Sequence, residues 1–244
     1  MKRLFPNVVH FSRLVISNVF LVDGGPGDRW LIDCGHWLER GALVREIKRT
    51  GLVPGDLTGI LLTHRHSDHA GNARFFHERF GMKVFAHEDD AKILSGELPR
   101  PRMDPAGSRP DVRVMVAFEN RWPSRVPIER TLRQGDSVGG LEVHWIPGHT
   151  EGSVFYKHEA TNSLLTGDSL LTAIPPLVRR AGFSLAYPIF STNLRLAHDS
   201  VLAFHRAAHA YENLLAGHGR PVLGNARARV DDYLARISIA PQTR

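Results

Sequence analysis

Cysteine is almost absent from the sequence, with Cys34 as the single example among 244 residues. One thiol excludes an internal disulfide and every metal or redox motif that is built from paired cysteines. Because disulfides belong to oxidising compartments, this usage favours a cytoplasmic protein. We expect Cys34 to face the core and to have no catalytic role.

Long apolar runs are also missing. No apolar stretch follows the two basic residues near the start, so we expect no signal peptide there. The apolar segment at residues 14–22 is too short to cross a bilayer, and it carries Ser17 and Asn18. We therefore expect no membrane partner.

Lysine is scarce as well: the chain has 5 Lys against 26 Arg, and its formal net charge is +6. A basic protein can bind a polyanion, but these arginines are spread along the chain and form no dense run. The expected partner is therefore a small-molecule substrate and not a nucleic acid.

The distribution of apolar residues predicts strands and helices that alternate along the chain. Strands are expected at residues 14–22, 29–33, 59–63, 83–86, 141–146, 153–158, 163–166 and 213–216. Helices are expected at residues 39–50, 70–80, 88–94, 194–210 and 226–237. Because both types mix in one continuous pattern, we expect a single α/β domain over residues 1–244.

Two segments interrupt this pattern. Residues 95–125 are rich in Pro and Arg, and we expect a surface excursion whose one strand-like piece is Val112–Phe118. Residues 172–192 are apolar, irregular and contain proline. We expect these two segments to form loops on the regular framework.

One loop is unusually rich in metal-binding side chains. Residues 64–69 read His-Arg-His-Ser-Asp-His and directly follow the strand expected at 59–63. Imidazole and carboxylate groups suit zinc, iron and manganese, and alternate positions of a tight loop converge on one point. We therefore predict four metal ligands in this loop: His64, His66, Asp68 and His69.

Three later residues share one arrangement, in which an apolar strand ends and a candidate ligand follows. His149 comes after a Pro-Gly pair, Asp168 after Thr-Gly and His218 after Ala-Gly. Glycine lets the backbone turn sharply and approach an ion closely. Functional groups collect on loops that a rigid framework positions, so we expect these three side chains to join the loop at 64–69.

The ordered combination of these motifs, over residues 10–220, resembles the metallo-β-lactamase-fold hydrolase superfamily, in particular its glyoxalase II and lactonase-like branch. The resemblance implies a four-layer αβ/βα sandwich with a dinuclear metal site at one edge. It also implies that Asp33 supports the metal loop. The ligands implied for the first ion are His64, His66 and His149. Those implied for the second ion are Asp68, His69 and His218, with Asp168 bridging both.

The implied cofactors are two divalent metal ions, with zinc as the first expectation and iron or manganese as alternatives. Two ions held about 3.5–4 Å apart can share a hydroxide, polarise a carbonyl and stabilise the departing oxygen. Asp68 and Asp168 are the expected catalytic carboxylates, and Asp168 can assist the departing group when protonated. The expected reaction is hydrolysis of an ester, thioester or lactone-like bond.

Other functions are compatible with the same motifs. A mononuclear iron oxidoreductase of the persulfide-dioxygenase type would use His64, His149 and Asp168. A metallo-nuclease or phosphodiesterase is a further alternative, although residues 95–125 are a small segment for binding RNA. A non-catalytic regulatory member would be expected to lose ligands. One iron with oxygen uptake would indicate the oxidoreductase, and about two zinc or manganese ions the hydrolase.

Two further features could contribute to a site. His205 and His209 lie at helical i, i+4 spacing without the intervening Glu of a zincin motif, so we expect a solvated helix face. The pair Arg179-Arg180 precedes three aromatic residues and predicts either a substrate loop or a basic surface turn. The aromatic residues are Phe183, Tyr187 and Phe190.

Overall fold

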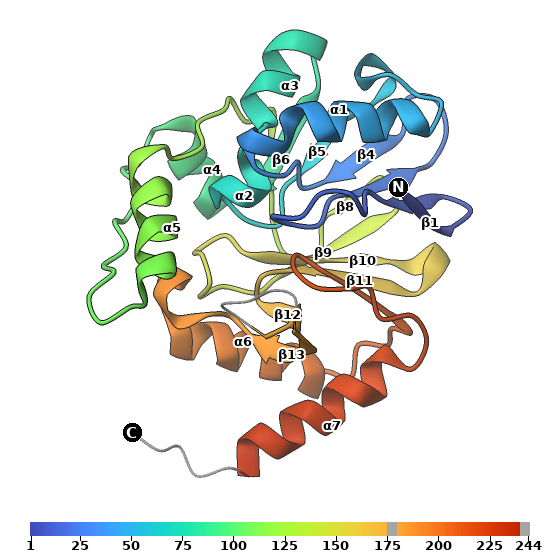
Figure 1. The fold of residues 1–244 in the computed structure, drawn as a ribbon. Helices are drawn as coiled ribbons and strands as arrows, with labels where there is room; N and C mark the ends of the chain where they lie inside the picture. The colour runs from blue at the N-terminus through green and yellow to red at the C-terminus, as the bar shows by residue number, and fades with distance from the viewer. Residues whose placement is uncertain (175–179, 240–244) are drawn as a thin grey trace.

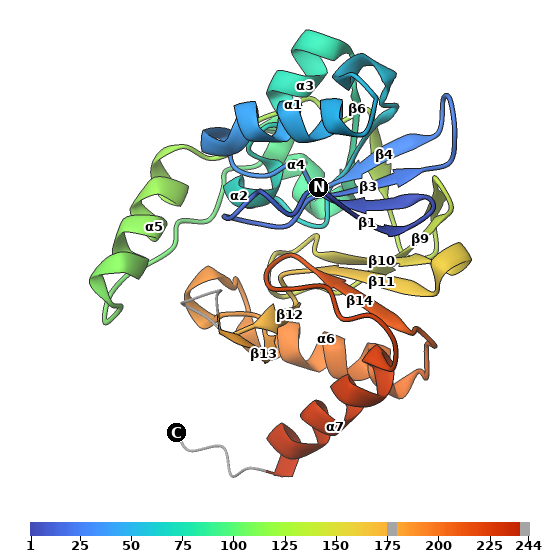
Figure 2. The same cartoon turned by 45° about the vertical axis from the view of Figure 1, so that its right-hand side comes forward.

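The computed structural model of the chain describes residues 1–174 and 180–239. Two β-sheets pack face to face, and helices cover the outer face of each sheet (Figures 1 and 2). The resulting order of layers is that of the predicted four-layer αβ/βα sandwich, which the structure therefore confirms.

The first sheet contains seven strands that neighbour one another in chain order. They are β1 (Lys2–Phe5), β2 (Val8–His10), β3 (Phe20–Asp23), β4 (Arg29–Ile32), β5 (Gly59–Leu61), β6 (Lys83–His87) and β7 (Arg130–Leu132). Strands β1 to β4 pair antiparallel, whereas β4 to β7 pair parallel. Parallel neighbours need crossover connections, which here contain the helices of one outer layer.

The second sheet contains five strands in the order β14–β11–β10–β9–β8. They are β8 (Ser137–Val138), β9 (Leu141–Trp145), β10 (Val154–His158), β11 (Ser163–Gly167) and β14 (Asn213–Ala216). Strand β10 is antiparallel to both β9 and β11, and β14 is parallel to β11. Strands β9, β11 and β14 therefore run in the same direction and end at one edge. A separate pair consists of β12 (Leu170–Ala173) and β13 (Ala181–Leu185).

Seven helices and four short 3-10 turns connect these strands in the described residues. The helices are α1 (Arg40–Arg49), α2 (Ser67–Ala70), α3 (Ala73–Phe80), α4 (Glu88–Ser95), α5 (Pro110–Arg121), α6 (Leu194–Arg206) and α7 (Ala226–Ile239). The turns are η1 (Trp37–Glu39), η2 (Pro54–Asp56), η3 (Glu159–Thr161) and η4 (Pro188–Phe190). Helices α1 and α3 cover the first sheet, α6 and α7 cover the second, and α5 lies beside both (Figures 1 and 2). None of these helices has the length and apolar composition that crossing a bilayer requires.

Apolar side chains form three core layers, one between the sheets and one under each helical layer. Phe155 and Leu164 pack in the layer that contains residues of α6 and α7, whereas the next residues, Tyr156 and Leu165, pack between the sheets. Successive side chains of a strand point to opposite faces. Both faces of the second sheet are therefore buried, which explains why its strands are continuous apolar runs.

The prediction of a strand-like piece at Val112–Phe118 is wrong, because these residues belong to α5. Valines at alternate positions fit the two-residue period of a strand. The structure instead buries Val112, Val116 and Glu119, which lie at i, i+4 and i+7 on one helix face. Pro110, in the first turn, is compatible with a helix start because its missing N–H has no partner there.

Other element boundaries differ less from the prediction. Residues 180–192 are more regular than expected, since β13 pairs with β12 and η4 follows. The strand expected at 14–22 begins only at Phe20, and the helix expected at 194–210 ends at Arg206. Arg179 lies outside the described residues.

Candidate metal centre

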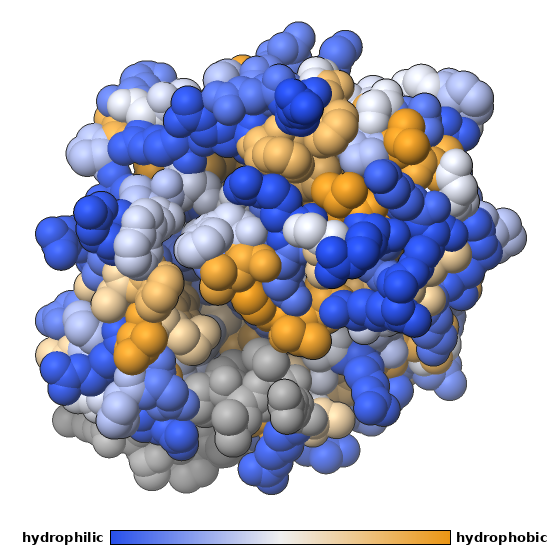
Figure 3. All heavy atoms as spheres, turned by 45° about the horizontal axis from the view of Figure 1, so that its top comes forward, coloured by the Kyte–Doolittle hydropathy of each residue, from blue (hydrophilic) through white to orange (hydrophobic). Residues whose placement is uncertain are grey.

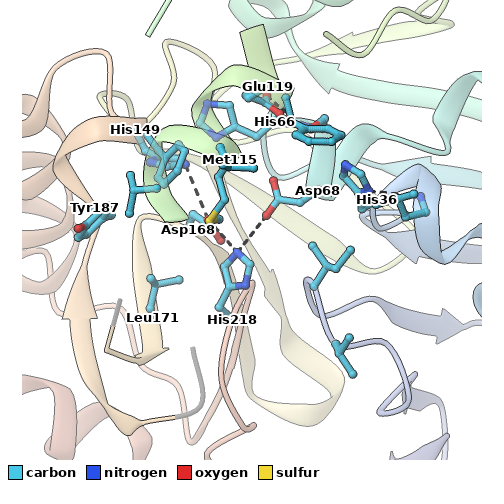
Figure 4. Close-up of a pocket in the computed structure, with 18 residues that line it drawn as sticks. His36, His66, Asp68, Met115, Glu119, His149, Asp168, Leu171, Tyr187 and His218 are labelled. Carbon is cyan, nitrogen blue, oxygen red and sulfur yellow. Dashed lines mark hydrogen bonds and ion pairs between the residues drawn. The ribbon is translucent and has the colours of Figure 1, made fainter. Parts of the chain in front are cut away.

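All seven side chains predicted as metal ligands lie at one edge of the two sheets, five of them on loops and two, Asp68 and His69, in the short helix α2. The loop at 64–69 follows β5, whereas His149, Asp168 and His218 follow β9, β11 and β14. Because those three strands run in the same direction, their carboxyl ends bring these residues together (Figure 4). The seven residues form two groups, each with potential ligand atoms within 4.8 Å of one another.

The first group consists of His64, His66 and His149, and all three are buried. Their Nε2 atoms have no hydrogen-bond partner in the described structure. Burial lowers the pKa of all three imidazoles, to about 4 for His149. The rings are therefore neutral at pH 7. Unpartnered buried nitrogens of this kind fit the ligand set of a metal ion.

Hydrogen bonds orient the ring of His64. Its Nδ1 lies 3.0 Å from the hydroxyl of Thr63, which itself donates to Asp33 over 2.8 Å. Because that hydroxyl hydrogen is directed to Asp33, the oxygen accepts from His64 Nδ1–H. This tautomer leaves the lone pair on Nε2, the atom without a partner in the described structure.

The second group consists of Asp68, His69, Asp168 and His218. Nε2 of His218 lies 3.1 Å from Asp68 Oδ2 and 3.2 Å from Asp168 Oδ2. Nε2 of His69 lies 3.2 Å from Asp168 Oδ1 and 3.5 Å from Asp68 Oδ2. Two carboxylates and two imidazoles therefore face one another.

These four residues strongly shift one another's pKa. Burial opposes ionisation of Asp68 and Asp168, yet the imidazoles of His69 and His218 hold both carboxyl pKa values well below the usual range. Burial also opposes protonation of His218, but the carboxylates raise its pKa to about 10, and that of His69 is raised as well. The negative charges of the two carboxylates are therefore balanced by two protonated imidazoles. A divalent cation supplies two positive charges and would displace the two protons.

Asp33 lies beneath the centre, where the resemblance places a supporting acidic residue. It accepts hydrogen bonds from the Thr63 backbone N–H and hydroxyl, and its Oδ2 lies 2.8 Å from His69 Nδ1. Its φ angle is +60°, a left-handed conformation that Asp tolerates better than most residues. The aspartate thereby joins the end of β5 to one imidazole of the second group.

Glycine before a candidate ligand allows a close approach, as the sequence predicts. A Cβ atom on Gly217 would overlap Asp168 Oδ1 and would lie 2.7 Å from His69 Cε1. Gly167 has a φ of +48°, and a Cβ there would lie 2.6 Å from the Thr63 hydroxyl. A larger residue at Gly217 would displace the second group, whereas one at Gly167 would displace Thr63, whose hydroxyl orients His64 of the first group.

A buried network that sequence reasoning missed joins two of the ligand loops. Asp90 of α4 accepts hydrogen bonds from the Arg65 backbone (2.9 Å) and guanidinium (2.6 Å). The same carboxylate accepts from the Thr150 hydroxyl (2.7 Å) and the Gly152 N–H (3.0 Å), and Arg65 also pairs with Glu151. One side chain thus holds the loop of His64 and His66 against the loop of His149. No local motif marks Asp90, because its partners come from distant parts of the chain.

A second missed contact joins α5 to the metal loop. Glu119 accepts from the backbone N–H and the hydroxyl of Ser67, the residue between His66 and Asp68. Arg100 binds the same carboxylate and also donates to the Glu119 backbone oxygen over 3.1 Å. Helix α5 is therefore attached to the loop of candidate ligands by hydrogen bonds from Ser67 to Glu119, whose charge is paired with Arg100.

A cavity of about 440 Å³ opens over the two groups. His66, Asp68, His149, Asp168 and His218 form its polar end (Figure 4). Apolar side chains from the N-terminal loop, η1, α5, β12 and η4 form most of the remaining wall. The candidate ligands are thus accessible to a small molecule from one side.

Three other residues considered in the sequence, His205, His209 and Cys34, lie outside the two ligand groups. The prediction of a solvated face for His205 is wrong, since this residue is buried and binds Asp231 and Tyr211. Helix α7 and the chain after α6 cover that face, which sequence spacing alone does not reveal. His209 stacks on Phe204. Cys34 is buried, as predicted.

The predicted substrate loop is supported for two of its aromatic residues. Tyr187 and Phe190 line the cavity, whereas Phe183 packs beside Tyr233. Arg180 is exposed and does not line it.

Comparison with known proteins agrees with this arrangement. A model of the metallo-beta-lactamase superfamily matches residues 12–217. The chain belongs to the metallo-beta-lactamase superfamily. This confirms the superfamily indicated by the motifs, which is one of hydrolytic enzymes.

Several relatives support the assignment. The probable metallo-hydrolase YybB of Bacillus subtilis is 31% identical, over 69% of this chain and 69% of that protein. The probable metallo-hydrolase YflN of the same organism is 29% identical, over 94% and 91% of the two chains. A metallo-beta-lactamase family protein from Thermus thermophilus has a similar crystal structure, with a TM-score of 0.69 and 25% identity, covering 97% of this chain and 81% of that one.

Proposed function

We propose that this member of the superfamily is a dinuclear metal-dependent hydrolase that cleaves an ester, thioester or lactone-like bond. The observation that carries the proposal is the pair of adjacent ligand groups at the polar end of one cavity. In the first group, the buried imidazole Nε2 atoms have no hydrogen-bond partner among the described residues. In the second group, two carboxylates face each other across a histidine. These are the donor sets expected of two divalent ions.

The ligands divide between the ions as the two groups do. His64, His66 and His149 would hold the first ion, and Asp68, His69 and His218 the second. Asp168 is suited to contact both, because its carboxylate lies 3.2 Å from His69 and His218 and 3.9 Å from His149. Zinc is the simplest choice for this donor set, with iron or manganese as alternatives.

When bound, divalent ions at this position lower the pKa of water and polarise a carbonyl oxygen. The protein side chains set the conditions for that chemistry. Asp68 and Asp168 are held ionised by their imidazole neighbours, which favours them as ligands and as acceptors of a hydrogen bond from water. The apolar walls limit access of bulk water to the reacting bond.

The test combines metal counting with turnover. Protein purified without added metal should contain about two zinc, iron or manganese ions per chain and should hydrolyse members of a panel of esters, thioesters, lactones and phosphodiesters. His66→Ala should lose metal-dependent turnover while remaining folded. His77→Ala is the matched control, since His77 lies in α3 and bonds to the Met82 carbonyl.

Two results would contradict the proposal. Unchanged turnover in metal-depleted His66→Ala protein would show that the centre does not perform the reaction. One iron per chain with oxygen uptake and no hydrolysis would instead support the mononuclear oxidoreductase. Cleavage of phosphodiesters alone would move the activity to the phosphodiesterase class.

A further inference from the structure

The cavity over the candidate ligands has one charged end, and the rest of its wall is mostly apolar. Its charged groups gather at the end formed by the ligands, together with Glu119, whose charge is paired with Arg100. The rest of the wall is formed by side chains without charge. Its apolar members are Val15, Ile16, Leu38, Val112, Val114, Met115, Phe118, Leu171, Tyr187 and Phe190.

Several of these apolar side chains are unusually exposed. Val15 is 76% exposed, Leu38 is 61%, Val114 is 57% and Met115 is 51%. Figure 3 shows apolar side chains gathered in part of a surface that is otherwise largely hydrophilic. Contiguous exposed apolar surface is typical of ligand-binding grooves and interaction sites. These side chains border the same cavity, so one ligand could cover them together.

Met115 has a central position among them. It extends from α5 into the space between His149 and Asp68, while Leu171 and Tyr187 lie on another side of the cavity (Figure 4). The thioether side chain is flexible and adapts to ligands of different shape. Because Glu119 attaches α5 to Ser67, this apolar surface is held over the ligands.

The charge distribution limits which ligand fits. None of the described residues that line the cavity is Lys or Arg. A phosphate or carboxylate on the substrate, away from the reacting bond, would find no cationic partner among them. A charge buried without a partner is strongly unfavourable.

We infer that the substrate is a neutral molecule whose reacting carbonyl carries an apolar chain, with the chain lying against Met115 and the apolar wall. The inference rests on the proposed function for the identity of the reacting group, but the apolar site is defined without it. A volume of about 440 Å³ is within the range of small-molecule sites and accommodates a chain of several carbons.

The test measures binding without turnover. Straight-chain methyl ketones from 2-butanone to 2-decanone carry a neutral carbonyl and cannot be hydrolysed. Isothermal titration on the metal-loaded protein should give a Kd that falls about fourfold for each added methylene until the cavity is filled. Methyl ketones of the same length that end in a trimethylammonium group, which cannot coordinate the ions, should bind at least about tenfold more weakly.

Variants locate the site. Met115→Asp should flatten the dependence of Kd on chain length, and Phe118→Ser should reduce it. Leu223→Asp is the matched control, because Leu223 is 45% exposed but lies outside the cavity, and it should retain the full dependence. Circular dichroism of each variant would verify its fold, and the wild-type series decides the question alone if Met115→Asp does not fold.

The outcomes separate this inference from the proposed function. A Kd that does not change with chain length, or tighter binding of the trimethylammonium series, would overturn the inference even if esters are cleaved. The same dependence in Met115→Asp as in the wild type would place the apolar site elsewhere. Chain-length-dependent ketone binding without hydrolysis of any substrate would support the apolar site and contradict the proposed function.

Discussion

At the scale of single residues, Asp90 links loops that are far apart in the sequence. Its carboxylate accepts four hydrogen bonds from the loops of His64 and His149, and its partner Arg65 is 2% exposed. Removing one member of a buried ion pair leaves the other charge without compensation. The arrangement of the first ligand group therefore depends on a residue that would not itself bind metal.

We expect Asp90→Ala to lower the free energy of unfolding by about 3–5 kcal/mol and to weaken metal binding. Urea denaturation of the metal-free protein measures the first effect. Asp89→Ala is the control, because the neighbouring Asp89 is partly exposed and pairs with His87 and Lys92 at the surface, so it should cost no more than about 1 kcal/mol. An equal decrease in the free energy of unfolding in both variants would show that Asp90 contributes no more than its neighbour.

Asp33 allows a test with less effect on the fold. Asparagine tolerates the left-handed backbone at this position, so Asp33→Asn should keep the loop but lose the carboxylate that faces His69. We expect metal affinity to fall about 10–100-fold, measured by competition with a chelator. Asp23→Asn, in the same hairpin but paired with Arg29, should leave affinity unchanged. Equal affinities for the Asp33 and Asp23 variants would show that Asp33 does not support the centre.

At the scale of elements, α5 marks the limit of sequence reasoning. The ligand loops were predictable because each follows a strand and contains residues of one chemical type. Alternate valines in α5 resemble a strand, and only the contacts of Val112, Val116 and Glu119 with the rest of the fold define a helix. Asp90 and Glu119 were missed for the same reason, since neighbours in space determine the role of a buried carboxylate.

Helix α5 should loosen when its attachment is removed. We expect Glu119→Gln to raise amide hydrogen exchange in residues 110–121 by at least about tenfold, because the buried pair with Arg100 and the charge facing Ser67 are lost. Hydrogen exchange with mass spectrometry measures this. Asp111→Asn, on the exposed side of the same helix, should leave exchange unchanged. If α5 exchanges equally slowly in both variants, the ion pair does not hold the helix.

At the scale of the whole molecule, metal binding should stabilise the fold, because the two ligand groups join both sheets. Each zinc ion at about 1,000 times its Kd should contribute about 4 kcal/mol. For a chain of this size each such contribution should raise the melting temperature by about 8–16 °C. Calorimetry with zinc and with excess chelator measures the difference. The double variant His66→Ala/His218→Ala should show no rise, and a full rise in that variant would place the bound ions elsewhere.

The layers of the molecule were predictable from its sequence, whereas the cavity was not. The strand and helix pattern predicted one α/β domain, the resemblance carried by the ordered motifs implied a four-layer sandwich, and the superfamily match agrees. The cavity wall combines the N-terminal loop, η1, α5, β12 and η4, which lie up to 175 residues apart between Val15 and Phe190. No local sequence pattern indicates that these segments lie together. The apolar lining of the cavity is therefore evident only from the structure.

The central claim is that seven side chains hold two ions side by side. Anomalous diffraction from crystals of zinc-loaded protein, recorded above and below the zinc edge, tests it most directly. The account predicts two peaks per chain, one beside His64, His66 and His149 and one beside Asp68, His69 and His218, with Asp168 next to both. A single peak, or peaks away from these residues, would contradict it.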